Sequence, residues 1–351
     1  MPRNRLSPGI EKYGQIPSPE SNSQKISAYF LVNNDKAAVL GNILKKGYFK
    51  VSNTIQKTAL AAAIALTSTT SFAGELGSLT SEVKVNDYEK GLTKTEVTIG
   101  KGSYKLSDDV SFLFDVDKDF IDSEGAARKE GWDTQFGLAQ GIGTIGDFNT
   151  TMYYLFRYDA SWKASDESDS SDTKQYIIAP YLSKDISLGG KDFSFGIELW
   201  AQLGNDNDES LKNISGVETN FYLSGALSEN WNLELAWYNF DYYDTDEEEY
   251  DYQIGTENYL TYSLPLVSGF SFNIENYVEA YHTPDSDTTI AYAHIQPEIE
   301  FKKEVNENFS WHAGVSYEAF NWEFKDAKGN KGDKDIFDNN EFQAYLGFTI
   351  Q

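Results

Sequence analysis

The chain has few side chains suited to catalysis or metal binding. Its three histidines, His282, His294 and His312, fall in three different segments, whereas a zinc site needs ligands at a recognisable spacing. Ser310 and His312 share a face, but a serine hydrolase also needs a group that orients the histidine. We therefore predict no enzyme, no cofactor and no metal site. His294 and His312 remain candidates for a pH response, because imidazole changes charge near neutral pH.

Acidic residues are the second candidate for chemistry. The stretch "DTDEEEYD", residues 244–251, concentrates carboxylates between two aromatic-rich segments. Hard oxygen ligands suit calcium, but no acidic run here has the EF-hand spacing with its glycine at the sixth position. We interpret the run as a solvated external loop. The alternative is that such loops hold divalent cations that bridge to lipopolysaccharide.

Composition limits the classes of function. Among 351 residues, 55 Asp and Glu face 29 Lys and Arg, for a net charge of −26, which argues against nucleic acid as a partner because phosphates require a basic surface. There is no cysteine, so disulfides and thiolate metal sites are excluded. Aromatic residues make up 15% of the chain, which favours strands. No apolar run is long enough for a transmembrane helix.

The first 73 residues contain a candidate targeting sequence for export. Residues 44–73 have a basic start, a short apolar stretch and a small-residue end at Ser71-Phe72-Ala73, the pattern of a signal peptide cut near Ala73. We expect residues 1–43 to be an unstructured extension produced by a start site called too early. The alternative is a cytoplasmic extension ahead of an internal membrane anchor. Residues 74–351 would form the folded domain.

Most of residues 74–351 alternates between apolar and polar residues, the period of a strand with two different faces. In "FSFGIELWAQL", residues 193–203, Phe, Ile and Leu fall on one side and Ser, Glu and Gln on the other. The alternation in "FSWHAGVSYEAF" predicts a continuous strand through Phe320. The expected segments are 77–86, 92–105, 109–119, 131–143, 148–163, 174–186, 191–204, 215–228, 231–244, 250–266, 269–283, 289–304, 308–325 and 339–351.

The connections alternate between short turns and long, charged loops. Short turns such as "TIGD" and "SLGG" are followed by loops such as "ASDESDSSDT". A transmembrane antiparallel β-barrel has this arrangement, with short periplasmic turns and long external loops. We predict an all-β barrel of about fourteen strands in the outer membrane of a Gram-negative-type bacterium, with twelve or sixteen as alternatives.

If the apolar face meets lipid, the other face of each strand lines the interior. Its charged residues are nearly all acidic, and isolated carboxylates cannot lie in a dry core. We therefore predict a water-filled pore that prefers cations. Arg157 is the exception, either as part of a constriction or in an ion pair with a neighbouring strand. The predicted pore-lining residues are Asp115, Arg157, Glu198, Glu218, Glu234, Glu275, Glu279, Glu298 and Glu318.

Four stretches of the chain carry a family resemblance: "SGVETNFYLSGALSENWNLELAWYNF", "YIIAPYLSKDISL", "DFSFG" and "NYLTYSLPL". They resemble segments of the outer membrane porin G type of monomeric fourteen-stranded porins. The resemblance implies a monomeric, passive channel for ions, monosaccharides and small oligosaccharides. The histidine pair to which that family's gate is attributed has no counterpart here around Ile290 or residues 324–326.

Two other functions remain open. A channel for acidic oligosaccharides, like the oligogalacturonate porins, should line its interior with Arg and Lys, and the predicted interior is acidic. A secreted all-β binding protein would stay soluble without detergent. For the leading interpretation, the expected partners are outer-membrane lipid, lipopolysaccharide, small hydrophilic solutes and the barrel-assembly machinery.

Overall fold

A computed structural model describes residues 75–88, 91–123, 128–163, 166–206, 214–244, 249–284, 288–327, 335–336 and 341–351. The predicted signal peptide, the upstream extension and parts of the predicted external loops, including residues 245–248, lie outside these ranges. No helix within them is long and apolar enough to cross a membrane. All the described residues belong to one compact unit, 53–351.

The described residues form strands and one short 3₁₀ helix, η1, at Val267–Gly269. In chain order the strands are β1 (Glu75–Tyr88), β2 (Leu92–Lys105), β3 (Val110–Ser123), β4 (Lys129–Ile145), β5 (Phe148–Lys163), β6 (Asp166–Leu188), β7 (Lys191–Asp206), β8 (Ile214–Ala226), β9 (Trp231–Asp244), β10 (Glu249–Pro265), β11 (Phe270–Thr283), β12 (Thr288–Asn306), β13 (Phe309–Tyr317), β14 (Phe320–Ala327), β15 (Asp335–Ile336) and β16 (Glu341–Ile350).

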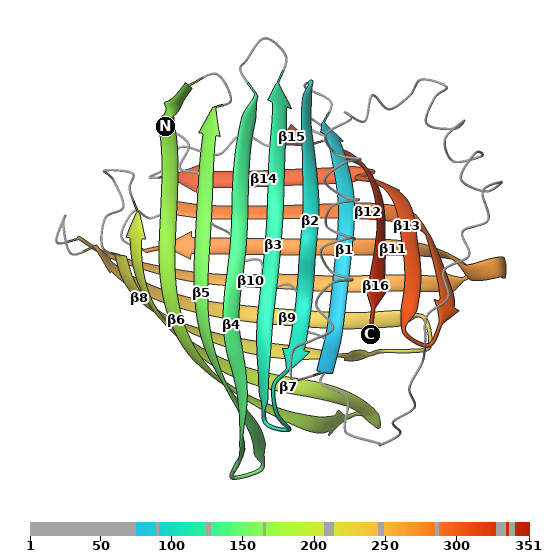
Figure 1. The fold of residues 1–351 in the computed structure, drawn as a ribbon, viewed down its shortest axis with the longest axis horizontal. Coiled ribbons are helices and arrows are strands. Elements are labelled where there is room, and N and C mark those ends of the chain that lie inside the picture. Colours follow the sequence, from blue (N-terminus) through green and yellow to red (C-terminus); the bar gives the residue numbers. More distant parts are fainter. Residues whose placement is uncertain are drawn as a thin grey trace. The chain divides into compact units, whose positions relative to one another are not determined.

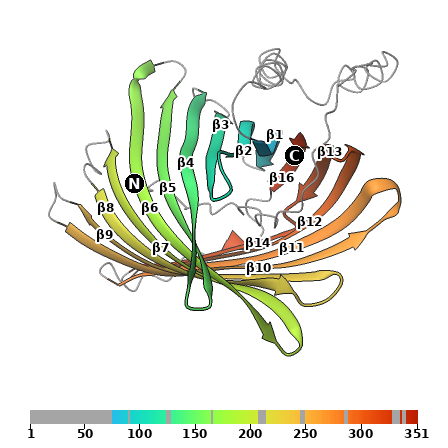
Figure 2. The same ribbon diagram turned by 60° about the horizontal axis from the view of Figure 1, so that its bottom comes forward.

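These strands form one closed antiparallel sheet. Strands β1 to β12 each pair with the next along the chain, and β1 pairs with β16 to complete the ring. Strands β13 and β14 both pair along β12 and occupy one position in the wall, while β15 pairs only with β14. The predicted fourteen-stranded β-barrel is therefore confirmed. In Figure 1, β2 to β6 run down the near wall and β9 to β12 cross behind them, and Figure 2 shows the same sheet curving around.

Short turns connect alternate pairs of strands. Glycines with positive φ form two of them, with Gly189 at 61° and Gly190 at 77° between β6 and β7, and Gly146 at 62° between β4 and β5. Two-residue hairpin turns that match the twist of the strands need positive φ, which glycine adopts without strain. In the second of these turns, Asp147 accepts a hydrogen bond of 2.8 Å from Lys184, and this contact lowers the pKa of the Asp147 carboxyl.

The prediction of an unbroken strand through Phe320 is wrong. Two residues, Glu318 and Ala319, interrupt the wall strand between β13 and β14. The backbone N–H of Glu318 bonds to the carbonyl of Glu341, and that of Ala319 bonds to the carbonyl of Ile295. The extra residue reverses the alternation, as a β-bulge does, so Phe320 pairs with the outward-facing Ile295 and not with a polar neighbour.

Candidate functional site: the inner face of the barrel

The two faces of the sheet differ in chemistry. Large apolar side chains stay exposed on one face, such as Leu203 at 63% and Trp237 at 62%. On the other face, side chains reach across an intervening strand: Tyr345 on β16 donates a 2.8 Å hydrogen bond to Glu298 on β12. Convergence of this kind fits the concave side of a closed sheet, so the apolar face is the outer face and the polar face is the inner face. An apolar outer wall is typical of membrane barrels.

The basic residue Lys118 lies on the outer face among aromatic rings. Lys118 on β3 is 8% exposed, and its Nζ lies 4.0 Å from the ring centre of Trp162 and 4.8 Å from that of Trp132. The same Nζ is 3.2 Å from a carboxylate oxygen of Glu130. Aromatic faces attract a cation electrostatically. The charge of Lys118 is therefore balanced by Glu130 and surrounded by rings of the kind expected in an interfacial aromatic belt.

The pairing register places all the predicted pore-lining residues on the inner face. Glu198 on β7 lies opposite Asn220 on β8, and Glu234 on β9 lies opposite Ser224. Because neighbours in register share a face, the same reasoning extends around the ring. The inner-face residues from that prediction are Asp115, Arg157, Glu198, Glu218, Glu234, Glu275, Glu279, Glu298 and Glu318, joined by His294 and His312.

The inner faces of β7 to β11 form an acidic wall. Among the side chains that the structure describes there, none is lysine or arginine. Tyrosine hydroxyls occupy this wall and donate to its carboxylates. Glu257 accepts from Tyr259 at 2.6 Å and from Tyr277 at 3.0 Å, and also from Tyr238. The acidic wall is defined by Glu198, Glu218, Glu234, Glu257, Glu275 and Glu279.

These inner-face tyrosines were absent from the predicted site. When faces are assigned from the alternation of apolar and polar residues, tyrosine is grouped with the apolar residues. Its presence on the inner face therefore gives no sequence signal for a polar interior. A usable signal does exist in the spacing Glu257-x-Tyr259 and Tyr277-x-Glu279. Residues two apart on a strand share a face, so a carboxylate and a phenol at that spacing can meet.

His294 joins the acidic wall to the interrupted strand. Its Nε2 lies 3.2 Å from Glu275 and its Nδ1 lies 3.2 Å from Glu318. Glu318 is 4% exposed and also accepts hydrogen bonds from Tyr292 and from Asn321, the latter at 2.8 Å. Since a buried carboxylate is costly unless it is paired, these contacts stabilise the interruption between β13 and β14.

The inner faces of β1 to β3 carry bases as well as acids. Lys84 lies 2.9 Å from Glu96, and Lys101 lies 3.2 Å from Asp115. Strict alternation from Glu96 would place Lys101 on the outer face. A shift in register between Thr98 and Gly100 brings Lys101 inward instead, which sequence periodicity does not reveal.

A row of three aspartates crosses β3, β4 and β5 on the inner face. Asp117 lies opposite Asp133, which lies opposite Asp159. One carboxylate oxygen each of Asp117 and Asp159 is buried without a hydrogen-bond partner among the described residues. Like charges directly opposite one another are destabilising. The described residues nevertheless contain no group of His, Asp and Glu arranged to hold a metal ion.

Arg157 lies two residues before Asp159 on β5, and its direct neighbours in the register are Gln135 and Gln175. The buried Nε of Arg157 has no hydrogen-bond partner among the described residues. Its cross-strand neighbours are thus amides and not carboxylates. The two expectations for Arg157, a part in a constriction or an ion pair with a neighbouring strand, therefore both stay predictions.

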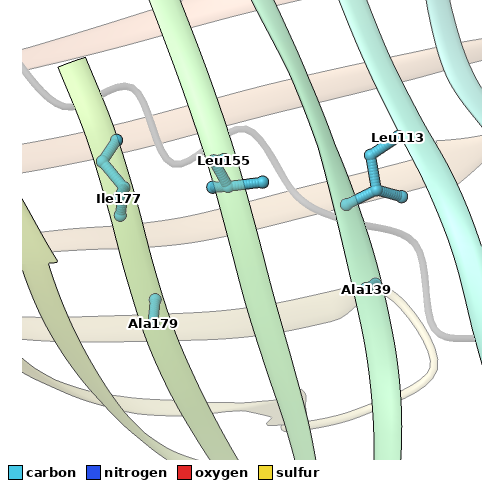
Figure 3. Close-up of a cluster of buried hydrophobic side chains, with 5 residues drawn as sticks. All are labelled: Leu113, Ala139, Leu155, Ile177 and Ala179. Atoms are coloured by element: carbon cyan, nitrogen blue, oxygen red, sulfur yellow. The ribbon is translucent and has the colours of Figure 1, made fainter.

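A small apolar cluster interrupts the polar inner face on β3 to β6. Leu113 and Leu155 both lie opposite Gly137, and Leu155 lies opposite Ile177. Figure 3 shows the cluster spread over these four strands. Tyr153 and Trp200 pack against it. The predicted polar lining did not include this cluster, whose members are Leu113, Ala139, Leu155, Ile177 and Ala179.

Together, the fold and its two faces define a closed fourteen-stranded β-barrel with an apolar outer face and a largely acidic inner face. No protein-family model matches the chain, and no curated protein matches it.

Solved structures show a weak similarity. CdiB from Acinetobacter baumannii aligns with a TM-score of 0.41 and 10% identity over 77% of this chain and 60% of CdiB. OmpT, an outer membrane protein of Vibrio cholerae, aligns with a TM-score of 0.40 and 10% identity over 80% of this chain and 99% of OmpT. An anion-selective porin from Comamonas acidovorans aligns with a TM-score of 0.36 and 10% identity over 78% of this chain and 98% of that porin. Similarity at this level carries no conclusion about function.

Proposed function

We propose that the chain is an outer-membrane channel through which small hydrophilic solutes diffuse passively, with a preference for cations. The acidic wall is the observation that carries this proposal. Fourteen strands enclose more space than inward side chains can fill, since about eight strands already pack solid. Carboxylates on such a face require water, and a water-filled passage lined by acids attracts cations and slows anions.

The solutes we propose are ions, monosaccharides and small oligosaccharides, as the resemblance to monomeric fourteen-stranded porins implies. Acidic oligosaccharides are disfavoured, because the described inner faces of β7 to β11 lack the bases that would bind them. Export through a signal peptide cut near Ala73, insertion by the barrel-assembly machinery, a monomeric state and divalent-cation contacts to lipopolysaccharide at the acidic loops belong to the same proposal.

The decisive experiment measures current through a planar bilayer that contains the refolded mature protein. Under a salt gradient, the reversal potential should show cation preference. Replacing Glu234 and Glu275 by Gln should shift that potential toward zero, because both carboxylates belong to the acidic wall. Asp87→Asn is the matched control, since Asp87 lies opposite Thr93 on the outer face. Absence of conductance would refute the channel, and anion preference would refute the role of the acidic wall.

A further inference from the structure

Three oxygen acceptors lie side by side on the inner faces of β7 and β8. Glu198 lies directly opposite Asn220, and Glu218 precedes Asn220 by two residues on the same face of β8. All three side chains are buried against the wall, with exposed fractions of 8% for Glu198, 5% for Glu218 and 0% for Asn220. Asn220 therefore lies between the two carboxylates.

The hydrogen bonding of this group is incomplete. The amide nitrogen of Asn220 donates to Glu198 at 3.5 Å, and the hydroxyl of Tyr222 donates to the same carboxylate at 3.0 Å. The carbonyl oxygen Oδ1 of Asn220 is fully buried and has no partner among the described residues. A buried acceptor without a donor costs about 1–3 kcal/mol. A ligand that brings its own N–H groups would supply the donor that this oxygen lacks.

A primary ammonium group fits these acceptors. It carries a positive charge and three N–H donors, which match the two carboxylates and the amide oxygen. Aromatic rings surround the group, with Tyr222 lying 6.4 Å from Tyr181 between ring centres and Trp200 opposite Glu218 in the register. Rings of this kind add cation–π attraction. A bare metal ion suits the site less well, because the described residues show no metal-holding arrangement.

The rest of the acidic wall favours a ligand with more than one positive charge. Glu234, Glu257, Glu275 and Glu279 follow on β9, β10 and β11, and no described inner-face base lies among them. A second ammonium on a flexible linear chain can reach these carboxylates while the first stays at Asn220. Linking two contacts in one molecule raises the overall affinity without any new site.

We propose that Glu198, Glu218 and Asn220 bind a terminal ammonium group of a linear polyamine, and that the bound polyamine reduces the current through the barrel. The inference rests on the proposed channel function. It differs from simple cation preference because it assigns binding to one place on the wall. The inner faces of β1 to β3 are less suitable, since Lys84 lies 2.9 Å from Glu96 and Lys101 lies 3.2 Å from Asp115 there.

The test uses spermidine on the refolded protein in a planar bilayer. Wild-type current should fall with spermidine concentration, and Glu198→Gln/Glu218→Gln should raise the half-blocking concentration about tenfold, equivalent to about 1.4 kcal/mol. The matched control is Glu300→Gln, which removes one inner-face carboxylate on β12, opposite Ser271 and Gly314 and outside the acidic wall, and should change the value less than about threefold. Equal effects of the double variant and the control would overturn the site.

Two substitutions of Asn220 should shift the half-blocking concentration of spermidine in opposite directions. Asn220→Asp adds a charge at the orphan acceptor and should lower the half-blocking concentration, whereas Asn220→Leu removes the acceptor and should raise it. Changes in the same direction would overturn the role of Asn220.

Each variant is first checked for its unblocked potassium conductance. A channel that conducts normally but lacks these effects refutes the polyamine site alone, while a protein that never conducts refutes the channel itself. Equal block by neutral maltotriose would refute the ammonium assignment.

Discussion

The imidazole Nε2 of His312 lies 2.8 Å from a carboxylate oxygen of Glu82, and the contact passes over Gly347. His312 is on β13, Glu82 on β1, and Gly347 pairs with both from β16, the strand between them. This hydrogen bond therefore spans the place where the first and last strands of the barrel meet. It depends on the absence of a side chain at position 347.

Gly347→Ala should destabilise the barrel by about 1–3 kcal/mol. An added Cβ would meet the His312 ring and would lie 2.7 Å from the carbonyl oxygen of Ser81, so both the His312–Glu82 hydrogen bond and the backbone must move. The free energy of unfolding in urea with detergent micelles is the measurement. Gly141→Ala is the control, because its Cβ would find its nearest atom at 3.8 Å. Equal stability of the two variants would contradict the prediction.

Lys118→Met should cost about 1–2 kcal/mol of unfolding free energy. It removes the nearer of the two cations beside the Glu130 carboxylate, at 3.2 Å, and leaves Arg128 at 3.9 Å. The double variant Lys118→Met/Glu130→Gln should recover most of that loss. A double-mutant cycle separates this coupling from the loss of contacts with Trp132 and Trp162. If the double variant is as unstable as the sum of the single variants, the ion pair is not the cause.

Lys101→Gln should increase cation preference. The register shift at Thr98 and Gly100 brings Lys101 to the inner face, where its ammonium partly neutralises Asp115. Removing that charge makes the interior more acidic, so the reversal potential under a salt gradient should move further in the cation direction. Lys184→Gln serves as control, because Lys184 pairs with Asp147 at a turn. A shift toward anions would show that Lys101 does not face the passage.

The closed barrel was predictable because each strand lies between two different environments. Alternation in segments such as residues 193–203 reflects that difference at every second residue, so both the strands and their antiparallel closure follow from the pattern. The register places the predicted acids on one face for the same reason.

The alternation of apolar and polar residues could not show the positions at which a strand changes register. The register shift before Gly100 turns Lys101 inward, and the interruption at Glu318 turns Phe320 outward. A single extra residue changes the face without changing the composition. The role of Tyr277 was missed because a phenol behaves as apolar in a pattern but as a hydrogen-bond donor beside a carboxylate.

The pairing of β1 with β16 also sets an order of events. Thr80 and Thr349, whose hydroxyl oxygens lie 3.0 Å apart, are separated by 269 residues along the chain. Contacts between such distant residues form late, because the loop between them must first be closed. Until they form, both β1 and β16 present unpaired edges that can capture another chain. The growing sheet therefore needs protection from its neighbours until its last strand arrives.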